Sequence, residues 1–312
     1  MYAQAALPSY SVPILMPSIA AAAATFATFA TLLAAVERNL LRCTGAQEQR
    51  TPSDADMASA YHLRSGGQRV RARLAIHAGF NLRLPPGDIV ALATTAELLH
   101  NASLIHDDLQ DRDTLRHGVA TVWSAFGDNT AICAGDLMLA AAYGALAEFS
   151  QASRLPALLK LTMARTATAI HGQCVDLSGP ARHDIASYEA MAMAKSGALL
   201  SLPTELALLA AGRLDAMASA RYAAESFAVG YQIVDDIDDI GIDADPLKIA
   251  HSFNIVLLLQ AGGQVGNQAG ARAAAVQLAQ QHFERAAAAA GALPDATGEL
   301  LTALISRLAQ RL

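Results

Sequence analysis

The chain carries the same aspartate pattern, DDxxD, twice, and this repetition constrains its fold and chemistry more than any other feature. The two copies span residues 107–111 and 235–239, and each follows an apolar run that predicts a helix. On a helix, residues i and i+4 project from one face and residue i+1 lies beside them. Each copy therefore predicts three grouped carboxylates: Asp107, Asp108 and Asp111 in the first cluster, and Asp235, Asp236 and Asp239 in the second.

Grouped carboxylates at the end of a buried helix face need a positive partner. Two unit charges about 4 Å apart repel by roughly 4 kcal/mol at an effective dielectric constant of about 20. Mg2+ prefers oxygen ligands and is commonly held by a few carboxylates together with substrate phosphates. The pattern therefore predicts a magnesium site. The simpler interpretation, two solvated acidic helix ends, does not explain why the spacing recurs.

The composition favours one large all-α domain. Of the 312 residues, 53% are hydrophobic and 16% are charged, which provides enough apolar surface for a sizeable core. Alanine is abundant and alternating β-branched runs are scarce, as in helical proteins. No linker is long enough to separate domains. We therefore predict a flexible apolar tail over residues 1–17 and one domain over residues 18–312. The net charge of −6 argues against a nucleic-acid partner.

Proline and glycine divide this domain into a series of predicted helices. The clearest are residues 129–149, 155–175, 187–211 and 214–239. The helix that carries the first cluster follows Pro85-Pro86-Gly87, and Asp88 is predicted to cap its start.

The N-terminal region raises the question of a membrane segment. Residues 14–36 contain no charged side chain and are long enough to span a bilayer. However, no basic residue precedes them and Pro17 interrupts the run. We therefore expect a first core helix from near Ser18 and no integral membrane segment.

The cysteine content indicates a reducing compartment. Cys43, Cys133 and Cys174 are odd in number and far apart, with no CxxC pair. Such cysteines commonly act as small buried apolar residues. We therefore expect a cytoplasmic protein without a zinc site.

Other motifs narrow the chemistry further. The chain has no GxGxxG, GxxxxGK[ST], HExxH or GxSxG sequence, so dinucleotide, P-loop, zincin and α/β-hydrolase sites are unsupported. Four arginines fall within ten positions, namely Arg64, Arg69, Arg71 and Arg73. In an acidic chain this grouping indicates either a local anion site or a solvated helix face.

Several further stretches occur in a recognisable order. They are GGQRVR at residues 66–71, the segment 97–111, LRHG at 115–118, AGD at 134–136, GQCVDL at 172–177, KSGAL at 195–199 and GYQIVDD at 230–236. From about Tyr61 to Asp245 the chain resembles the polyprenyl synthetase family, the trans-isoprenyl diphosphate synthases.

The resemblance implies an isoprenoid synthase fold, a helical bundle around a deep central cavity, usually as a homodimer. In that family the aspartate clusters hold Mg2+ ions, which grip the diphosphate of an allylic isoprenyl diphosphate. The diphosphate leaves, and the double bond of isopentenyl diphosphate attacks the resulting allylic cation. Loss of a proton completes the longer chain. Metal ions stabilise the leaving charge and an apolar cavity excludes water.

The resemblance also implies roles for individual residues. All six aspartates of the two clusters match metal ligands. The allylic diphosphate site corresponds to Arg116, Lys195, Gln232 and Lys248. The residues that match catalytic positions are Lys195, Ser196, Gln232, Gln173 and Asp176. The isopentenyl diphosphate site corresponds to Gln68, Arg71, His100 and His117.

Three departures from the family pattern bear on function. Gln68 replaces a lysine and His117 replaces an arginine, both at the acceptor diphosphate site, while the loop after the second cluster is short and keeps only Lys248. Charge-assisted hydrogen bonds are roughly twice as strong as neutral ones, so the acceptor half is predicted to be weakened.

Three hypotheses follow from these departures. The first is an elongating prenyltransferase with a relaxed acceptor site. The second is a class I terpene synthase-like enzyme that ionises an allylic diphosphate without elongation. The third is a non-catalytic partner subunit of an active homologue, which the intact aspartate clusters argue against.

The helix before the first cluster bears on product length. Ala102 and Ser103 are small, so a growing chain is predicted to pass this level and to end at a floor formed by Leu99, with Leu98, or by Met138 on a neighbouring helix. We therefore predict a C15–C20 or longer product.

Overall fold

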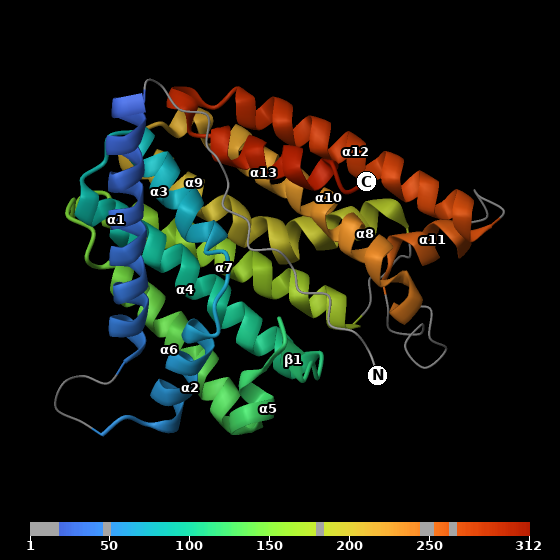
Figure 1. The fold of residues 1–312 in the computed structure, drawn as a ribbon, viewed down its shortest axis with the longest axis horizontal. Helices are drawn as coiled ribbons and strands as arrows, with labels where there is room; N and C mark the ends of the chain where they lie inside the picture. Colours follow the sequence, from blue (N-terminus) through green and yellow to red (C-terminus); the bar gives the residue numbers. More distant parts are fainter. Residues whose placement is uncertain (1–18, 46–50, 179–183, 244–252, 262–266) are drawn as a thin grey trace.

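The fold was analysed in a computed structural model that describes residues 19–45, 51–178, 184–243, 253–261 and 267–312 (Figure 1). The predicted tail over residues 1–17 and the predicted ligand Lys248 lie outside these ranges. The described chain is almost entirely helical, which confirms the all-α fold class.

The elements follow one another with short connections. In the N-terminal half they are α1 (Ile19–Thr44), α2 (Asp54–Arg64), α3 (Val70–Asn81), α4 (Pro86–Gln110), β1 (Leu115–Arg116), β2 (Val119–Ala120), α5 (Val122–Phe126), α6 (Asp128–Leu146) and α7 (Leu155–Ser178). The remaining elements are α8 (Ile185–Ala192), the π-helical turn η1 (Met193–Gly197), α9 (Ala198–Ala211), η2 (Leu214–Ala216), α10 (Met217–Asp243), α11 (Ile255–Ala261), α12 (Gln268–Gly291), η3 (Pro294–Ala296) and α13 (Glu299–Ala309).

Two apolar cores organise the bundle, and α9 lies where they meet. One core joins α1, α3, α4 and α6, and the other joins α10, α11, α12 and α13. Every residue of α9 from Ala198 to Leu208 is buried, as expected for a helix that is apolar on all sides. Figure 1 shows α1, in blue, crossing the long helices at a steep angle.

The abundant alanine is used at helix–helix contacts. Small side chains let two helices approach closely and still fill the space between them. In α6 and α12, the alanines that are almost completely buried are Ala131, Ala134, Ala142, Ala145, Ala271, Ala275, Ala279, Ala286 and Ala290. Helices α6 and α12 pack most extensively against α4 and α10, which carry the two aspartate clusters.

The predicted cap at Asp88 is wrong. Helix α4 begins at Pro86 after Pro85, and no side chain caps its start. Because a proline at the first helical position has no N–H to satisfy, the helix can begin without such a cap. Asp88 lies inside the first turn and accepts hydrogen bonds from Ser150 N at 2.8 Å and Ser150 Oγ at 2.9 Å. This contact ties the start of α4 to the connection between α6 and α7.

The buried role predicted for the cysteines is also wrong for two of them. Cys133 and Cys174 are exposed on α6 and α7, and Cys43 is partly buried. They lie on outward helix faces, which three widely spaced positions in a sequence do not reveal. None of the helices in the described ranges has the length and apolar character that crossing a membrane requires.

Candidate active site

The first aspartate cluster lies where α4 ends. Asp108 is buried, with 1% of its side chain exposed, and its Oδ1 accepts from Nε and Nη2 of Arg116 at 2.9 and 2.7 Å. Its Oδ2 is buried without a hydrogen-bond partner in the structure. Asp107 is half-buried and Asp111 is exposed. Asp108 is therefore engaged with the protein, while Asp107 and Asp111 project from the helix end.

A β-hairpin brings Arg116 back to the cluster. Arg116 pairs with Val119 across an antiparallel two-stranded ladder, with His117 and Gly118 as the turn. Both turn residues have positive φ, 52° and 81°, as a tight two-residue hairpin turn requires. The hairpin holds Arg116 against α4 and leaves His117 exposed at its tip.

The second cluster divides in the same way. Asp236 is 6% exposed and accepts hydrogen bonds from Tyr188 Oη at 2.8 Å, Ile255 N at 2.8 Å and Gln232 Nε2 at 3.0 Å. Asp235 is half-buried and Asp239 is exposed. Asp236 thus joins α10 to α8 and to the start of α11.

The sequence predicted one α-helix over residues 187–211, which lie between the two clusters in the sequence. That prediction is wrong at η1, which has a π-helical turn. The turn packs against α7 at Gly172, where a Cβ atom would lie 2.3 Å from Lys195 N, and against α10 at Gly197. Single π-helical turns are frequent at functional sites. Here the turn carries Lys195, whose Nζ forms an ion pair with Asp176 Oδ2 on α7.

Electrostatic interactions connect both clusters to the ion pair of Lys195 with Asp176. Lys195 interacts electrostatically with Asp107 and Asp111 of the first cluster. Asp176 interacts with Asp111 and also with Tyr188, the partner of Asp236 in the second cluster. The ion pair therefore lies near the first cluster and near Tyr188, the partner of the second.

Burial changes the acidity of the projecting carboxyls. Desolvation raises the pKa of Asp107 to about 6, although the nearby Lys195 ammonium favours its charged form. Desolvation likewise raises the pKa of Asp235 to about 7, opposed by a hydrogen bond from Tyr231. These carboxylates lack enough positive charge from the protein alone.

The donor set fits a hydrated hard cation. Within the residues that the structure describes, no three metal-binding side chains converge on one point. Mg2+ is seldom held by a complete protein cage and usually keeps waters and substrate phosphates as ligands. Half-buried or exposed carboxylates suit that mode of binding, and a divalent cation would supply the missing positive charge.

Other predicted residues lie near the clusters. Gln173 Nε2 donates to Gln110 Oε1 at 3.0 Å, and the buried Oε1 of Gln173 has no partner in the structure. Ser196, on the π-helical turn, is partly buried. Leu99, Ala102 and Met138 belong to the apolar core, and half-buried Ser103 donates to His100 O at 2.9 Å. The role of these four residues in product length remains a prediction.

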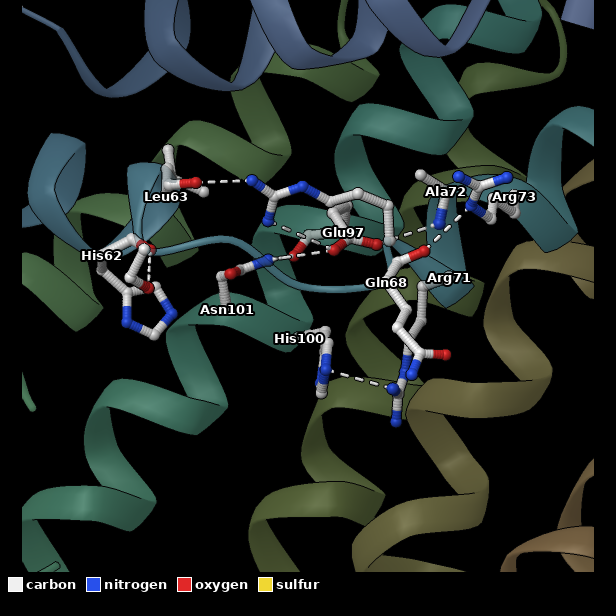
Figure 2. A network of polar contacts seen from close by, with 11 residues as sticks. His62, Leu63, Gln68, Arg71, Ala72, Arg73, Glu97, His100 and Asn101 are labelled. Atoms are coloured by element: carbon white, nitrogen blue, oxygen red, sulfur yellow. Dashed lines mark hydrogen bonds and ion pairs between the residues drawn. The ribbon is translucent and has the colours of Figure 1, made fainter. Parts of the chain in front are cut away.

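The predicted acceptor site contains a close polar pair. Arg71 Nη1 lies 3.1 Å from His100 Nε2, and Figure 2 shows the two side chains pointing toward each other from α3 and α4. Burial, together with the positive charge of Arg71, lowers the pKa of His100 well below its usual value. His100 is therefore neutral and accepts from Arg71. Gln68 is exposed in the loop before α3, and the exposed His117 lies on the hairpin.

The sequence did not predict two residues of the site, Tyr188 and Glu97. Tyr188 donates to Asp236 from α8, and no local pattern indicates that contact. Glu97 is 2% exposed in the middle of α4. A buried acidic residue in an otherwise apolar helix is a detectable signal, since such residues are seldom buried unless paired.

Comparison with solved structures identifies the fold. The geranylgeranyl pyrophosphate synthetase of Geoglobus acetivorans superposes with a TM-score of 0.78 at 22% identity, covering 91% of this chain and 99% of that one. This chain therefore has the isoprenoid synthase fold. The polyprenyl synthetase family model matches residues 54–249, and the chain belongs to that family.

Sequence relatives agree with this assignment. The probable farnesyl diphosphate synthase of Sinorhizobium fredii is 33% identical over 223 residues, which cover 68% of this chain and 67% of that protein. The probable farnesyl diphosphate synthase of Bradyrhizobium diazoefficiens is 33% identical over 201 residues. That match spans 61% of this chain and 60% of the relative, which is less than two thirds of the relative's length.

Proposed function

We propose that this protein is a Mg2+-dependent prenyltransferase that condenses isopentenyl diphosphate with an allylic diphosphate to give a longer isoprenyl diphosphate. The observation that carries the proposal is the pair of aspartate clusters whose electrostatic contacts converge on the ion pair of Lys195 with Asp176. Relatives named farnesyl and geranylgeranyl diphosphate synthases support it.

In the donor half, the carboxylates divide their work. Asp107, Asp111, Asp235 and Asp239 would hold magnesium, which when bound stabilises the charge that develops on the leaving diphosphate. Asp108 and Asp236 would hold the clusters in place through Arg116, Tyr188 and Gln232. Of the six aspartates predicted as metal ligands, we therefore propose that the other four bind magnesium.

Cationic side chains of the chain complete the donor half. Lys195 already lies beside both Asp107 and Asp111, so its ammonium can contact a diphosphate held by these carboxylates. Arg116 keeps 31% of its side chain exposed while it binds Asp108. Its guanidinium therefore retains donors for the same diphosphate.

The apolar wall protects the reactive intermediate. Leu99, Ala102 and Met138 are each at most 2% exposed and belong to one apolar core. Such a wall excludes the water that would quench an allylic cation. Because the side chains at residues 102 and 103 are small, we propose that the product is C15–C20 or longer.

The acceptor half depends on Arg71 and His100. Arg71 donates to neutral His100 and can present its remaining donors to the diphosphate of isopentenyl diphosphate. Gln68 and His117, both exposed, would add weaker contacts than a lysine and an arginine. We therefore propose elongation with a low affinity for the acceptor.

The function can be tested directly with purified protein. Incubation with Mg2+, isopentenyl diphosphate and dimethylallyl, geranyl, farnesyl or geranylgeranyl diphosphate should yield longer diphosphates, identified by mass spectrometry. Asp107→Asn should lose this activity and Asp54→Asn, at an exposed site on α2, should keep it. Hydrocarbons or alcohols formed without the acceptor would instead indicate a terpene synthase-like enzyme. No turnover until a homologue is added would indicate a partner subunit.

We also propose that the protein forms a homodimer through α7. Met163, Ile170 and Leu177 are 55%, 56% and 48% exposed and recur every seventh residue, so they form one apolar stripe. Ile132 on α6 is 46% exposed. Contiguous exposed apolar side chains mark interaction surfaces. Light scattering should give a dimer mass for the native chain and a monomer mass for Ile170→Glu; a native monomer would contradict the proposal.

The cysteines support a cytoplasmic location. Cys43, Cys133 and Cys174 are all free thiols, and unpaired cysteines are typical of proteins in a reducing compartment. Localisation of a tagged copy in cell fractions tests this assignment.

A further inference from the structure

Glu97 is the centre of a buried polar network that supports the predicted acceptor site. Its Oε2 accepts from Ala72 N at 3.0 Å, and its Oε1 lies 3.8 Å from Nη1 of Arg69 and 3.3 Å from Nδ2 of Asn101. Figure 2 shows Ala72 and Asn101 beside Glu97, with Arg71 and His100 nearby. Glu97 is 2% exposed, so none of these contacts competes strongly with water.

The network satisfies the start of α3, which has no cap of its own. Arg69 precedes the helix in a left-handed conformation with φ of 51°, and its side chain makes no capping bond. The first N–H groups of a helix need acceptors and favour negative charge nearby. Glu97, from α4, supplies that carboxylate to Ala72 N. A second bond, from Arg69 Nη2 to Leu63 O at 2.5 Å, fixes the preceding residues.

The arginines at and just before the start of α3 differ in their partners. Arg69 is engaged by Glu97 and Leu63 O, and Arg73 Nε donates to Gln68 O at 2.9 Å. Arg71 lies between these two positions on α3. Its Nη1 contacts His100, and its Nε has no partner among the described residues. Arg71 therefore has a buried guanidinium donor without a partner among the described residues.

We propose that Glu97 is a positioning residue that sets the affinity for the acceptor diphosphate by holding Arg71 and His100 in place. It anchors α3, which carries Arg71, through Ala72 N, and it lies one turn before His100 on α4. The carboxylate therefore links the two elements that carry the pair. This inference rests on the proposed function, because it takes Arg71 and His100 as the acceptor site.

The test separates the two substrates of the reaction. Glu97→Ala removes the acceptor of Ala72 N and the charge facing Arg69, so it should raise the KM for isopentenyl diphosphate by roughly 10²-fold, the effect of a misplacement of about 1 Å. The KM for the allylic diphosphate should stay within about twofold. Glu97→Gln keeps an oxygen for Ala72 N and should recover part of the loss.

A second buried carboxylate provides the matched control. Glu205 on α9 is likewise buried, at 1% exposed, and its two oxygens accept from Arg165 at 2.6 Å. Glu205→Ala and Glu205→Gln should lower the melting temperature without a selective change in the acceptor KM. If the Glu97 and Glu205 variants change both KM values alike, or if Glu97→Ala leaves the acceptor KM unchanged, the positioning role is refuted.

Binding measurements keep this test distinct from that of the proposed function. Isothermal titration calorimetry measures substrate binding without turnover. Isopentenyl diphosphate, with Mg2+ in the buffer, is titrated into protein that already contains Mg2+. Native binding that weakens in Glu97→Ala, but not in Glu205→Ala, supports the inference even if no elongated product forms. Native binding that Glu97→Ala leaves unchanged overturns the inference alone. Absence of binding by the native protein overturns both the acceptor site and the inference.

Discussion

Replacement of Gly172 by alanine tests whether the contact between α7 and the π-helical turn controls the site. An added Cβ would lie 2.3 Å from Lys195 N and 2.7 Å from both Ala194 C and Lys195 Cα. All three are backbone atoms, so no side-chain rotation relieves the clash. To restore an ordinary contact of 3.4 Å, the turn and α7 must separate by about 1 Å.

The expected magnitudes follow from that displacement. Overpacking of this kind costs about 1–3 kcal/mol, and the gain in helix propensity from glycine to alanine offsets about 1 kcal/mol. The free energy of unfolding should therefore fall by about 0–2 kcal/mol. Lys195 would also move away from Asp176, and a misplacement of about 1 Å can lower the rate by roughly 10²-fold. We therefore expect turnover to fall by roughly 10²-fold while the protein remains folded.

The assay compares two glycines in helices. Gly87 is exposed in the first turn of α4, and a Cβ there meets no atom within 4 Å. Gly87→Ala should keep native turnover with equal or slightly higher thermal stability. Product formation by mass spectrometry and unfolding by circular dichroism give both quantities. If Gly172→Ala matches the native protein in both, the close contact does not position Lys195 and the reasoning fails.

Three further outcomes are expected. Gln68→Lys combined with His117→Arg should lower the KM for isopentenyl diphosphate, because two cations replace neutral or weakly basic groups. An unchanged KM would mean that the acceptor diphosphate does not bind at these residues. Ser103→Phe should shorten the product seen by mass spectrometry, and unchanged chain length would remove the pocket argument. Burial lowers the pKa of His62 to about 4, below its unfolded value of about 6.5. The unfolded state therefore binds the proton first, and up to roughly 3 kcal/mol of stability is lost as the pH falls from about 6.5 to about 4. Replacing His62 with asparagine should flatten the melting temperature across that range; an unaltered profile would refute this cause.

Local patterns in the sequence predicted the features that depend on local spacing. The DDxxD spacing placed two carboxylate groups at helix ends, and the apolar periodicity with alanine-rich composition predicted an all-α fold. These features follow from the geometry of a single helix. Boundaries were less accurate where a neighbour decides them, as at Asp88, which bonds to Ser150 across 62 residues rather than capping its own helix.

Contacts between distant elements could not be predicted in this way. The π-helical turn is packed against Gly172 on another helix, and nothing within residues 187–211 distinguishes it from an α-helix. Two partners of Asp236 are similarly remote, since Tyr188 precedes it by 48 residues and Ile255 follows it by 19. The sequence showed which carboxylates are grouped, but only the packing shows which of them already have partners.

The unequal surroundings of the two adjacent aspartates in each cluster bear on how such a chain can diverge. Asp108 and Asp236 contribute to the folded structure whether or not substrate is ever bound. Asp107 and Asp235 instead carry an energetic cost of burial that the fold alone does not require. A descendant that abandoned catalysis should therefore retain aspartate at 108 and 236 while residues 107 and 235 drift to neutral side chains. A homologue that has lost the aspartates at 107 and 235 but keeps those at 108 and 236 is therefore expected to be catalytically inactive.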